Sequence, residues 1–255
     1  MKSAYVTGAS QGIGKEFVRV LSKRLNVFLI SRTSSDLSKV IQEIQPDSIG
    51  ILKAIPLDLS KKEDRGKLYE IIENDPDLEI LVNNAGFGTI GLFADNHLKA
   101  ELEEIHVNVK AVVELSHAAL KNLKKQKTGS LINVASIAGF LPAPGSAIYA
   151  ASKAFVKSFT ESLHEEMKPF GVKVQALCPG LTHSAFHERA GINKNKYPKF
   201  LWQSSDEVVN ASLESLERNE AVCITGLVNQ TAITFTEFMP RAIIRKLAGS
   251  VKLQD

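Results

Sequence analysis

Close to its N-terminus the chain reads Thr7-Gly8-Ala9-Ser10-Gln11-Gly12-Ile13-Gly14. A short apolar run, Ala4-Tyr5-Val6, precedes this glycine loop, and Phe17, Val20 and Leu21 follow it at helical spacing. A strand, a glycine loop and a helix in this order predict a site for a nucleotide pyrophosphate, because the unpaired N–H groups and the dipole of a helix N-terminus favour an anion.

Each glycine of the loop has a predicted task. Gly8 permits a tight turn, Gly12 lets the backbone approach the pyrophosphate, and Gly14 lets the helix pack closely on the strand. The spacing Gly-x-x-x-Gly-x-Gly is one residue longer than the Gly-x-Gly-x-x-Gly fingerprint of dinucleotide sites. A glycine turn without a ligand is the alternative that the loop alone leaves open.

Short apolar runs alternate with amphipathic segments along the rest of the chain. Strands are predicted at Ala4–Val6, Asn26–Ser31, Gly50–Leu57, Ile80–Asn83, Gly129–Ala135, Val172–Leu177 and Ala221–Thr225. The amphipathic segments between them, such as Leu37–Ile44 and Val208–Leu216, predict helices. This order predicts an α/β fold in one domain over residues 1–255, a Rossmann-type, doubly wound, mostly parallel seven-stranded sheet flanked by helices. Ligands of such sheets bind beyond the carboxyl ends of the strands.

Tyr149 and Lys153 lie four residues apart in a segment, Ile148–Lys168, whose apolar spacing predicts a helix. Residues at this spacing share one face of a helix. A free phenol titrates near pH 10, and a neighbouring ammonium would lower the pKa of Tyr149 toward a value useful for proton transfer. The pair alone is equally compatible with a surface tyrosine beside a solvated lysine.

The composition sets broader limits. A chain of 255 residues with 44% hydrophobic residues can bury one sizeable core. No apolar run reaches the length of a membrane span, and the N-terminus leads directly into a strand, so we expect no signal peptide. Cys178 and Cys223 lie in apolar runs, which favours buried thiols and a cytoplasmic location. The net charge of +3 shows no clustering that would predict a nucleic-acid partner.

These motifs resemble those of the short-chain dehydrogenase/reductase superfamily in its single-domain form, and the resemblance runs almost from end to end. It is carried by the glycine loop, by the Tyr149–Lys153 pair and by further segments at the expected places. Those segments are Pro56-Leu57-Asp58-Leu59, Asn83-Asn84-Ala85-Gly86, His106-Val107-Asn108-Val109, Ser136 and Pro179-Gly180.

The resemblance implies a catalytic tetrad of Asn108, Ser136, Tyr149 and Lys153. Ser136 would donate a hydrogen bond to a substrate carbonyl oxygen, and Tyr149 would act as general acid or base. Lys153 would lower the pKa of Tyr149 and hold the nicotinamide ribose, and Asn108 would support a water that links Lys153 to solvent. Taken by itself, Asn108 would favour an asparagine bonded to its own helix backbone, and the other members of the tetrad reverse this preference.

The resemblance also implies a nicotinamide cofactor. Its expected site comprises Gly8, Ser10, Gln11, Gly12, Ile13, Gly14, Ser31, Arg32, Asp58, Leu59, Asn83, Ala85, Gly86, Tyr149, Lys153, Pro179, Gly180 and Thr182. At the end of the second strand Ser31 stands where an acid would bind a ribose 2′-OH, and Arg32 supplies a cation for a 2′-phosphate, which predicts NADP(H) in preference to NAD(H). Gln11 stands where some family members have a second basic phosphate ligand. A solvated Arg32 without a phosphate is the alternative.

Residues 183–205 are the expected substrate lid. Their aromatic residues predict an apolar or bulky carbonyl or alcohol as the small-molecule substrate, although a packed helix would look the same. They are Phe186, Tyr197, Phe200 and Trp202. Phe87–Gly91 and Phe140–Pro144 are the expected walls opposite. His183 and His187 stand four residues apart like metal ligands, but no further ligand cluster accompanies them, so no metal is predicted.

The tail, residues 231–255, interleaves apolar residues with Arg241, Arg245 and Lys246. A subunit contact in a homodimer or homotetramer, a cover for the chain's own cleft, and a peripheral contact with an anionic membrane are its three interpretations.

Three classes of function stay open at this point. A working oxidoreductase is favoured because all four tetrad positions carry the expected side chains. A cofactor-binding regulatory or scaffold protein is the main rival, since a fold does not guarantee turnover. An epimerase or dehydratase would need a larger substrate domain than this chain can hold.

Overall fold

The computed structural model describes residues 1–183 and 198–250. Within these ranges, seven parallel strands form one sheet in the order β3-β2-β1-β4-β5-β6-β7. The strands are β1 (Ser3–Thr7), β2 (Asn26–Ser31), β3 (Leu52–Pro56), β4 (Leu78–Asn83), β5 (Ser130–Val134), β6 (Lys173–Cys178) and β7 (Val222–Ile224). The predicted Rossmann-type α/β fold is confirmed, and all six pairings between these strands are parallel.

Strand ends differ from the prediction by at most a few residues. The starts of β3 and β4 each differ by two residues, and β3 was expected from Gly50. Gly50 instead donates its N–H to the carbonyl oxygen of Ser22 at 2.8 Å, and a Cβ at this position would overlap the backbone of Leu25. Gly50 therefore belongs to a tight turn that brings the chain into β3.

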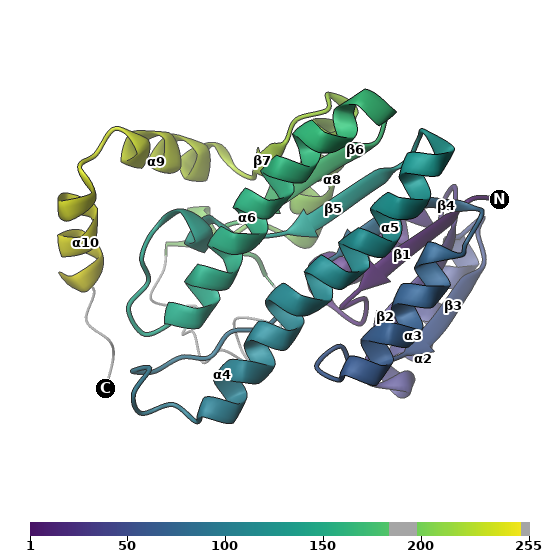
Figure 1. Cartoon of the computed structure of the whole chain (residues 1–255), viewed down its shortest axis with the longest axis horizontal. Coiled ribbons are helices and arrows are strands. Elements are labelled where there is room, and N and C mark those ends of the chain that lie inside the picture. The colour runs from purple at the N-terminus through teal and green to yellow at the C-terminus, as the bar shows by residue number, and fades with distance from the viewer. Residues whose placement is uncertain (184–197, 251–255) are drawn as a thin grey trace.

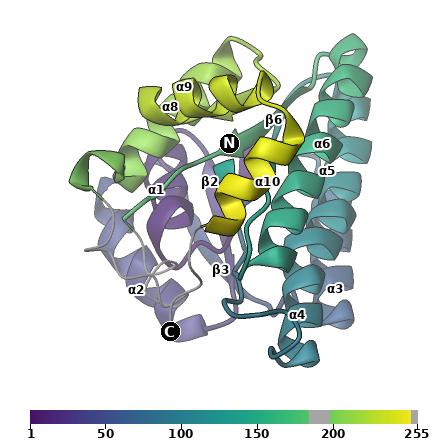
Figure 2. The same cartoon turned by 90° about the vertical axis from the view of Figure 1, so that its left-hand side faces the viewer.

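Helices cover both faces of the sheet (Figures 1 and 2). The α-helices are α1 (Gly12–Leu21), α2 (Ser34–Ile44), α3 (Lys62–Glu73), α4 (Leu98–Ile105), α5 (Val112–Gln126), α6 (Ala147–Met167), α8 (Ser205–Glu217), α9 (Leu227–Glu237) and α10 (Arg241–Ser250). Shorter helical segments are η1 (Gln45–Asp47), the π-helical η2 (His106–Ala111), η3 (Ile137–Phe140), η4 (Lys168–Phe170) and η6 (Lys199–Leu201).

The core is divided into two layers by the sheet. Alternate residues of a strand point to opposite faces, so Val6 joins one layer and Tyr5 the other. The first layer packs α1, α2 and α8 on the sheet, and the second packs α3, α5 and the end of α6. β1 is buried along its whole length, as expected for a central parallel strand.

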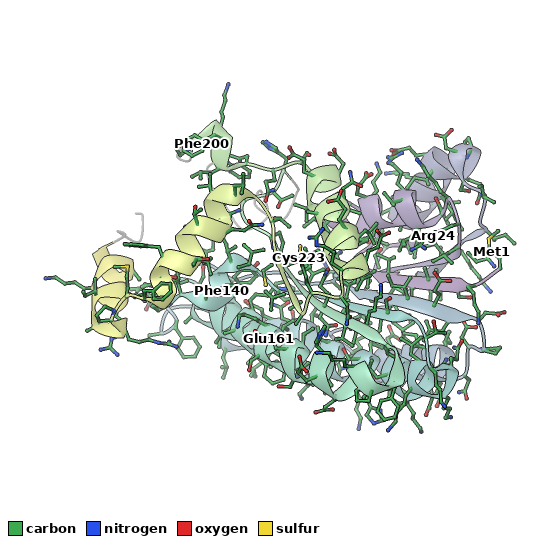
Figure 3. The ribbon with its side chains drawn as sticks, turned by 90° about the horizontal axis from the view of Figure 1, so that it is seen from above. Met1, Arg24, Phe140, Glu161, Phe200 and Cys223 are labelled. Carbon is green, nitrogen blue, oxygen red and sulfur yellow. The ribbon has the colours of Figure 1, made fainter. Side chains whose placement is uncertain are left out.

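The carboxyl ends of the parallel strands lie at one edge of the sheet, where a ligand site is expected. In Figure 3, Met1 and Arg24 mark the amino ends of the strands on one side and Phe140 marks the carboxyl ends on the other. At the C-terminal side, α9 and α10 reach away from the sheet beyond β7 (Figure 1). Among the described helices, none has both the length and the apolar composition that crossing a membrane requires.

Candidate active site

A cleft of about 870 Å³ lies at the carboxyl ends of the strands. It brings together most residues that the sequence assigned to a site. These are Gly8, Ser10, Gln11, Gly12, Ile13, Ser31, Arg32, Asp58, Leu59, Ala85, Gly86, Ser136, Tyr149, Lys153, Pro179, Gly180 and Thr182. Gly14, Asn83 and Asn108 do not line the cleft, and each is placed differently.

The glycine loop has the geometry that the sequence predicted. Gly8 and Gly12 have φ values of 65° and 55°, in the left-handed region that favours glycine. A Cβ on Gly14 would overlap the carbonyl oxygen of Gly8, so only glycine lets the first turn of α1 approach the end of β1 this closely. Gln11 precedes α1 without a side-chain capping bond, and the first turn of the helix opens toward the cleft.

Asn84 and Thr7 hold this loop, and sequence reasoning missed both. The Asn84 side chain donates to the carbonyl oxygens of Thr7 at 2.9 Å and Gly8 at 3.2 Å. In return the Thr7 hydroxyl accepts from the backbone N–H groups of Asn84 and Ala85, each at 2.9 Å. The available signal was the pair of asparagines at the end of β4, but the prediction assigned Asn83 to the cofactor site and left out Asn84.

Asn83 is buried inside the molecule, away from the cleft. Its amide donates to Asn133 at 2.9 Å and to Ser116 at 3.2 Å. The last residue of β4 points to the α5 side of the sheet, whereas the backbone of the next residues turns into the cleft. A direct side-chain contact between Asn83 and a cofactor is therefore not supported by this placement.

Ser136, Tyr149 and Lys153 meet at one point of the cleft. Ser136 caps η3 by accepting from the N–H of Ala138 at 3.1 Å, and its side chain acts to lower the pKa of Tyr149. The Lys153 ammonium lies 5.8 Å from the centre of the Tyr149 ring and donates to the carbonyl oxygen of Val134 at 2.7 Å. The spacing along α6 predicted this shared face.

The protonation of the pair differs from the prediction. Burial raises the pKa of Tyr149 to about 12, although the hydrogen bond with Ser136 opposes the rise. Burial lowers the pKa of Lys153 to about 8. We expected Lys153 to lower the pKa of the phenol, but desolvation disfavours both charged forms more strongly in the cofactor-free protein. Tyr149 is thus held as a neutral phenol at pH 7.

Asn108 lies on η2, one turn beyond α4. Its amide nitrogen donates to the carbonyl oxygen of Phe87 at 2.8 Å and to the hydroxyl of Ser152 at 3.1 Å, and its oxygen accepts from the N–H of Phe87 at 3.2 Å. These bonds leave the helix, so the alternative of an asparagine bonded to its own backbone is wrong. The loop after β4 depends on Asn108 for its position.

The other end of the cleft has the chemistry expected for the adenosine part of a cofactor. The hydroxyl oxygen of Ser31 is buried and makes no hydrogen bond within the described residues, and the exposed Arg32 and Lys61 line the cleft beside it. An unpaired buried hydroxyl next to cations suits a polar, anionic ligand group. Asp58 already accepts from the N–H and hydroxyl of Ser60, at 3.0 and 2.8 Å. The residues present therefore fit a nicotinamide dinucleotide.

α9 forms a wall of the cleft that the sequence offered only as one of three interpretations of the tail. Asn229, Ala232 and Ile233 line the cleft, and Ile233 is 4% exposed. A Cβ on Gly180 would overlap the Asn229 side chain, so α9 packs directly on the segment after β6. Farther along, Phe238 is 84% exposed and makes no part of this wall.

Part of the expected lid falls outside the described residues, including Phe186, His187 and Tyr197. At its edges, His183 stacks on Trp202 with ring centres 5.1 Å apart, and Thr182 bridges to Gln203. Phe200 is 73% exposed. Among residues 1–183 and 198–250, no cluster of His, Cys, Asp or Glu has the arrangement of a metal site.

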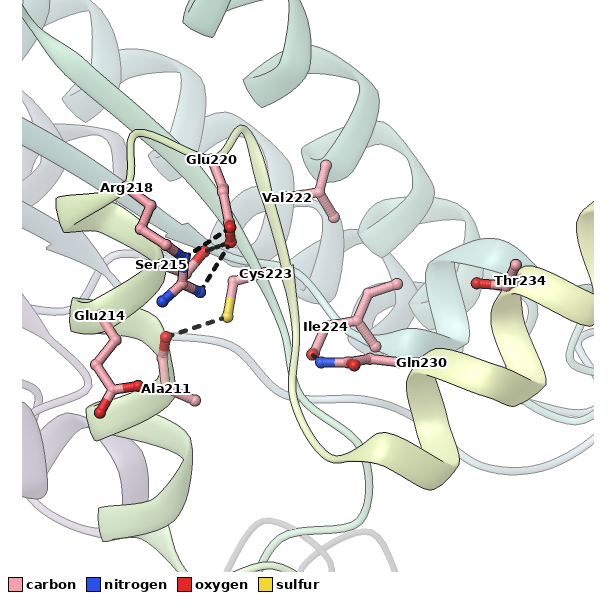
Figure 4. Close-up of a pocket in the computed structure, with 10 residues that line it drawn as sticks. All are labelled: Ala211, Glu214, Ser215, Arg218, Glu220, Val222, Cys223, Ile224, Gln230 and Thr234. Carbon is pink, nitrogen blue, oxygen red and sulfur yellow. Dashed lines mark hydrogen bonds and ion pairs between the residues drawn. The ribbon is translucent and has the colours of Figure 1, made fainter.

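A smaller hollow of about 460 Å³ lies between α8, β7 and α9 (Figure 4). Arg218 pairs there with Glu220 at 2.8 Å, and Ser215 donates to the same carboxylate at 2.7 Å. The Cys223 thiol donates to the carbonyl oxygen of Ala211. Because these polar groups are paired with one another and none belongs to the tetrad, the large cleft is the candidate active site.

Comparison with known proteins gives a family. A model described as short chain dehydrogenase matches residues 2–195. An uncharacterized oxidoreductase of Staphylococcus aureus strain USA300 is 34% identical over 186 residues, which are 72% of this chain and 79% of the relative. A solved short-chain dehydrogenase from Sphingobium yanoikuyae in complex with NADPH is 28% identical, with a TM-score of 0.85, over 100% of this chain and 98% of that chain. The bulky-bulky ketone specific alcohol dehydrogenase from Comamonas testosteroni is 26% identical, with a TM-score of 0.80, over 95% and 96%.

Proposed function

The chain belongs to the short chain dehydrogenase family of oxidoreductases, and we propose that it is an NADP(H)-dependent enzyme that interconverts a carbonyl compound and an alcohol. One observation carries the proposal. Ser136, Tyr149 and Lys153 line the same cleft as the glycine loop. The same cleft thus offers a phosphate-binding helix end and a pair of hydroxyl donors for one carbonyl oxygen.

The bound cofactor would supply or accept a hydride at the substrate carbon. The glycine loop and the N-terminus of α1 would hold its phosphates, and Ser31 and Arg32 its adenosine end. Ser136 donates a hydrogen bond to the substrate oxygen as negative charge develops there. Tyr149 then gives its proton to that oxygen, because its raised pKa keeps the phenol protonated at neutral pH. A neutral phenol is the form that the reductive direction requires, because there Tyr149 gives up its proton.

Arg32 supports NADP(H) in preference to NAD(H). No acidic side chain follows β2 where one would bind a ribose 2′-OH, since Ser31 and Arg32 occupy those positions. Arg32 is exposed at the edge of the cleft and its guanidinium can bind a phosphate with two parallel hydrogen bonds. The name of the Sphingobium structure, which contains NADPH, agrees with this proposal.

An apolar or bulky carbonyl compound is the proposed substrate. The cleft beyond Tyr149 is walled mainly by apolar side chains, which remove apolar surface of a ligand from water. They are Phe87, Ile90, Leu141, Pro142, Leu181 and Ile233. The ketone specificity in the name of the Comamonas relative belongs to that protein but points to the same class.

A homo-oligomer in the cytoplasm is the proposed state of the protein. Phe235 and Phe238 on the tail are 67% and 84% exposed, which favours a contact that covers them. Cys178 and Cys223 are free and buried, in agreement with a reducing compartment.

The proposed function is tested by NADPH consumption, followed by absorbance, with small and bulky ketones, aldehydes and quinones. We expect turnover with bulky ketones, higher with NADPH than with NADH, and a loss of roughly 10²–10⁴-fold in Tyr149→Phe. Tyr69→Phe is the matched control, because Tyr69 bonds to His117 away from the cleft. Equal turnover in Tyr149→Phe and wild type would contradict the mechanism, and tight NADPH binding without turnover on any compound would favour a cofactor-binding regulatory role.

A further inference from the structure

Glu104 and Asn108, one helical turn apart, hold the loop after β4 by its backbone. The N–H of Thr89 donates to the carboxyl of Glu104 at 2.8 Å. Asn108 bonds both the N–H and the carbonyl oxygen of Phe87. The two side chains thereby offer hydrogen-bond donors and acceptors to the backbone of the loop, as a neighbouring strand would. The Glu104 carboxyl also lies 3.4 Å from the amide nitrogen of Asn108, so the two holding points are joined.

Glu104 belongs to a buried pair of carboxyl groups. Glu104 is 0% exposed and Glu101 is 3% exposed. The hydroxyl of Thr89 lies between them, 2.9 Å from an oxygen of each. The same oxygen of Glu104 accepts from the Thr89 N–H, and the same oxygen of Glu101 accepts from Asn96 at 2.7 Å.

This arrangement requires one more proton than an ionised Glu101, an ionised Glu104 and the Thr89 hydroxyl contain together. A hydroxyl has one proton and can donate to only one acceptor at a time. Two ionised carboxylates at 2.9 Å would leave one of them facing a lone pair of the Thr89 oxygen. If one carboxyl is protonated, it donates to Thr89, and Thr89 donates onward to the other. The geometry therefore indicates a single proton held by the pair.

The surroundings favour Glu104 as the carboxyl that takes this proton. Burial raises its pKa, and the charge of Glu101 adds to the rise, whereas the bonds from Thr89 and the charge of Lys153 oppose it. From α6, Lys153 and Tyr149 are the titratable groups that face it, and an ionised Glu104 would raise the pKa of both. Its protonation therefore bears directly on the reacting pair.

The held loop touches the reacting tyrosine. Gly88 lies between the two held residues, Phe87 and Thr89, and a Cβ on Gly88 would stand 3.0 Å from the Tyr149 ring. The backbone of Gly88 thus packs closely against the Tyr149 side chain. A shift of the loop would free the ring to move away from Ser136.

We propose that Glu104 is a positioning residue that carries a proton at neutral pH and, bridged through Thr89 to the carboxylate of Glu101, holds the Phe87–Thr89 loop against the ring of Tyr149. The consequence for turnover rests on the proposed function, whereas the protonation of Glu104 does not. The two parts can therefore fail separately.

The protonation is tested without substrate or cofactor. Infrared spectra of the full chain with ¹³C-labelled glutamate should show a protonated-carboxyl band at pH 7 that is lost in Glu104→Gln. Glu166→Gln, an exposed change of the same kind on α6, should keep the band. A band that persists in Glu104→Gln, or no band in the wild type, would overturn the proposal. If Glu104→Gln does not fold, Thr89→Val removes the bridge alone and should shift the band of the retained Glu104.

The positioning is tested by kinetics on the carbonyl substrate. Glu104→Ala should lower kcat by about tenfold or more with little change in NADPH affinity, because a misplacement of about 1 Å can cost about a hundredfold. Glu104→Gln, neutral and of the same shape, should restore most of this loss and should lack the alkaline decline of kcat that ionisation of Glu104 causes in the wild type. If the carboxylate instead acts as a counter-charge to Lys153, Glu104→Gln will fall as far as Glu104→Ala at pH 7, and the proposal is wrong.

Discussion

Replacing Lys153 with methionine should stabilise the cofactor-free protein at neutral pH. Lys153 is 5% exposed and forms no ion pair within residues 1–183 and 198–250. Its amine donates to one backbone carbonyl oxygen, that of Val134, at 2.7 Å. The folded protein therefore keeps a charge in a place where burial disfavours it, and methionine fills nearly the same volume without a charge.

The magnitude follows from the pKa. A value lowered from 10.5 to about 8 corresponds to about 3 kcal/mol of unfavourable free energy for the charged amine at pH 7. The variant also loses the hydrogen bond to Val134, which is worth about 1 kcal/mol. The free energy of unfolding should thus rise by roughly 2 kcal/mol, or about 4–8 °C in Tm for a protein of this size.

The gain should depend on pH in a definite direction. Between pH 8 and 10.5 Lys153 binds a proton in the unfolded chain but not in the folded protein. The unfavourable free energy that Lys153 contributes to folding therefore decreases as the pH rises. Below pH 8 both states are protonated and the full cost is present. The advantage of Lys153→Met is therefore largest at pH 7 and disappears as the pH approaches 10.5.

Denaturant unfolding of the two proteins from pH 7 to 10 measures this difference. Lys157→Met is the matched control one turn farther along α6, where a partly exposed ion pair with Glu161 at 2.8 Å contributes about 1 kcal/mol or less. A Lys153→Met protein that is less stable than wild type at pH 7, or a difference that does not change with pH, would refute the electrostatic reasoning. The stabilised variant should turn over substrate poorly, as expected for a site that trades stability for function.

Three further changes probe the glycines and the phenol. Gly14→Ala should weaken NADPH binding and lower the free energy of unfolding by about 1–3 kcal/mol, because the new Cβ would meet the carbonyl oxygen of Gly8. The control is Gly66→Ala on α3, where a Cβ would meet nothing within 4 Å, and this change should be neutral or stabilising. Calorimetry measures the stability of both variants, and titration with NADPH measures their affinity. Gly88→Ala should lower kcat while NADPH affinity is kept, since its Cβ presses on the Tyr149 ring, and an unchanged kcat would argue against that contact. The difference in ultraviolet absorbance between wild type and Tyr149→Phe should show no tyrosinate at pH 10, because the pKa of Tyr149 is raised to about 12, whereas an ordinary phenol would be half ionised.

The fold and the glycine loop were predictable because their signals are local. Apolar runs bounded by turn residues identified all seven strands, and the parallel sheet follows from their alternation with helices. Gly8 and Gly14 are required by backbone conformation and by close approach within a few residues of each other. The four-residue spacing of Tyr149 and Lys153 likewise fixed their shared helix face.

Other parts of the site depend on contacts between residues far apart in the chain. The doubled asparagine at the end of β4 is visible in the sequence, but it does not indicate that the Asn84 side chain holds the end of β1, more than 70 residues away. The buried hydrogen bonds of the Asn83 side chain to Ser116 and Asn133 likewise join residues far apart in the chain. The wall that α9 adds to the cleft depends on where the chain turns after β7.

The protonation states of the site show most clearly what the sequence determines and what only the folded structure decides. Spacing gave the residue types of the reacting pair, a tyrosine beside a lysine, and thereby the kind of chemistry, whereas the pairing of Glu101 with Glu104 was not predicted. Whether Tyr149 is a phenol or a phenolate, and whether Glu104 carries a proton, was set by how completely the folded chain removes each group from water. Desolvation arises from the packing of many distant residues around one atom, so it emerges only when the helices and strands are assembled.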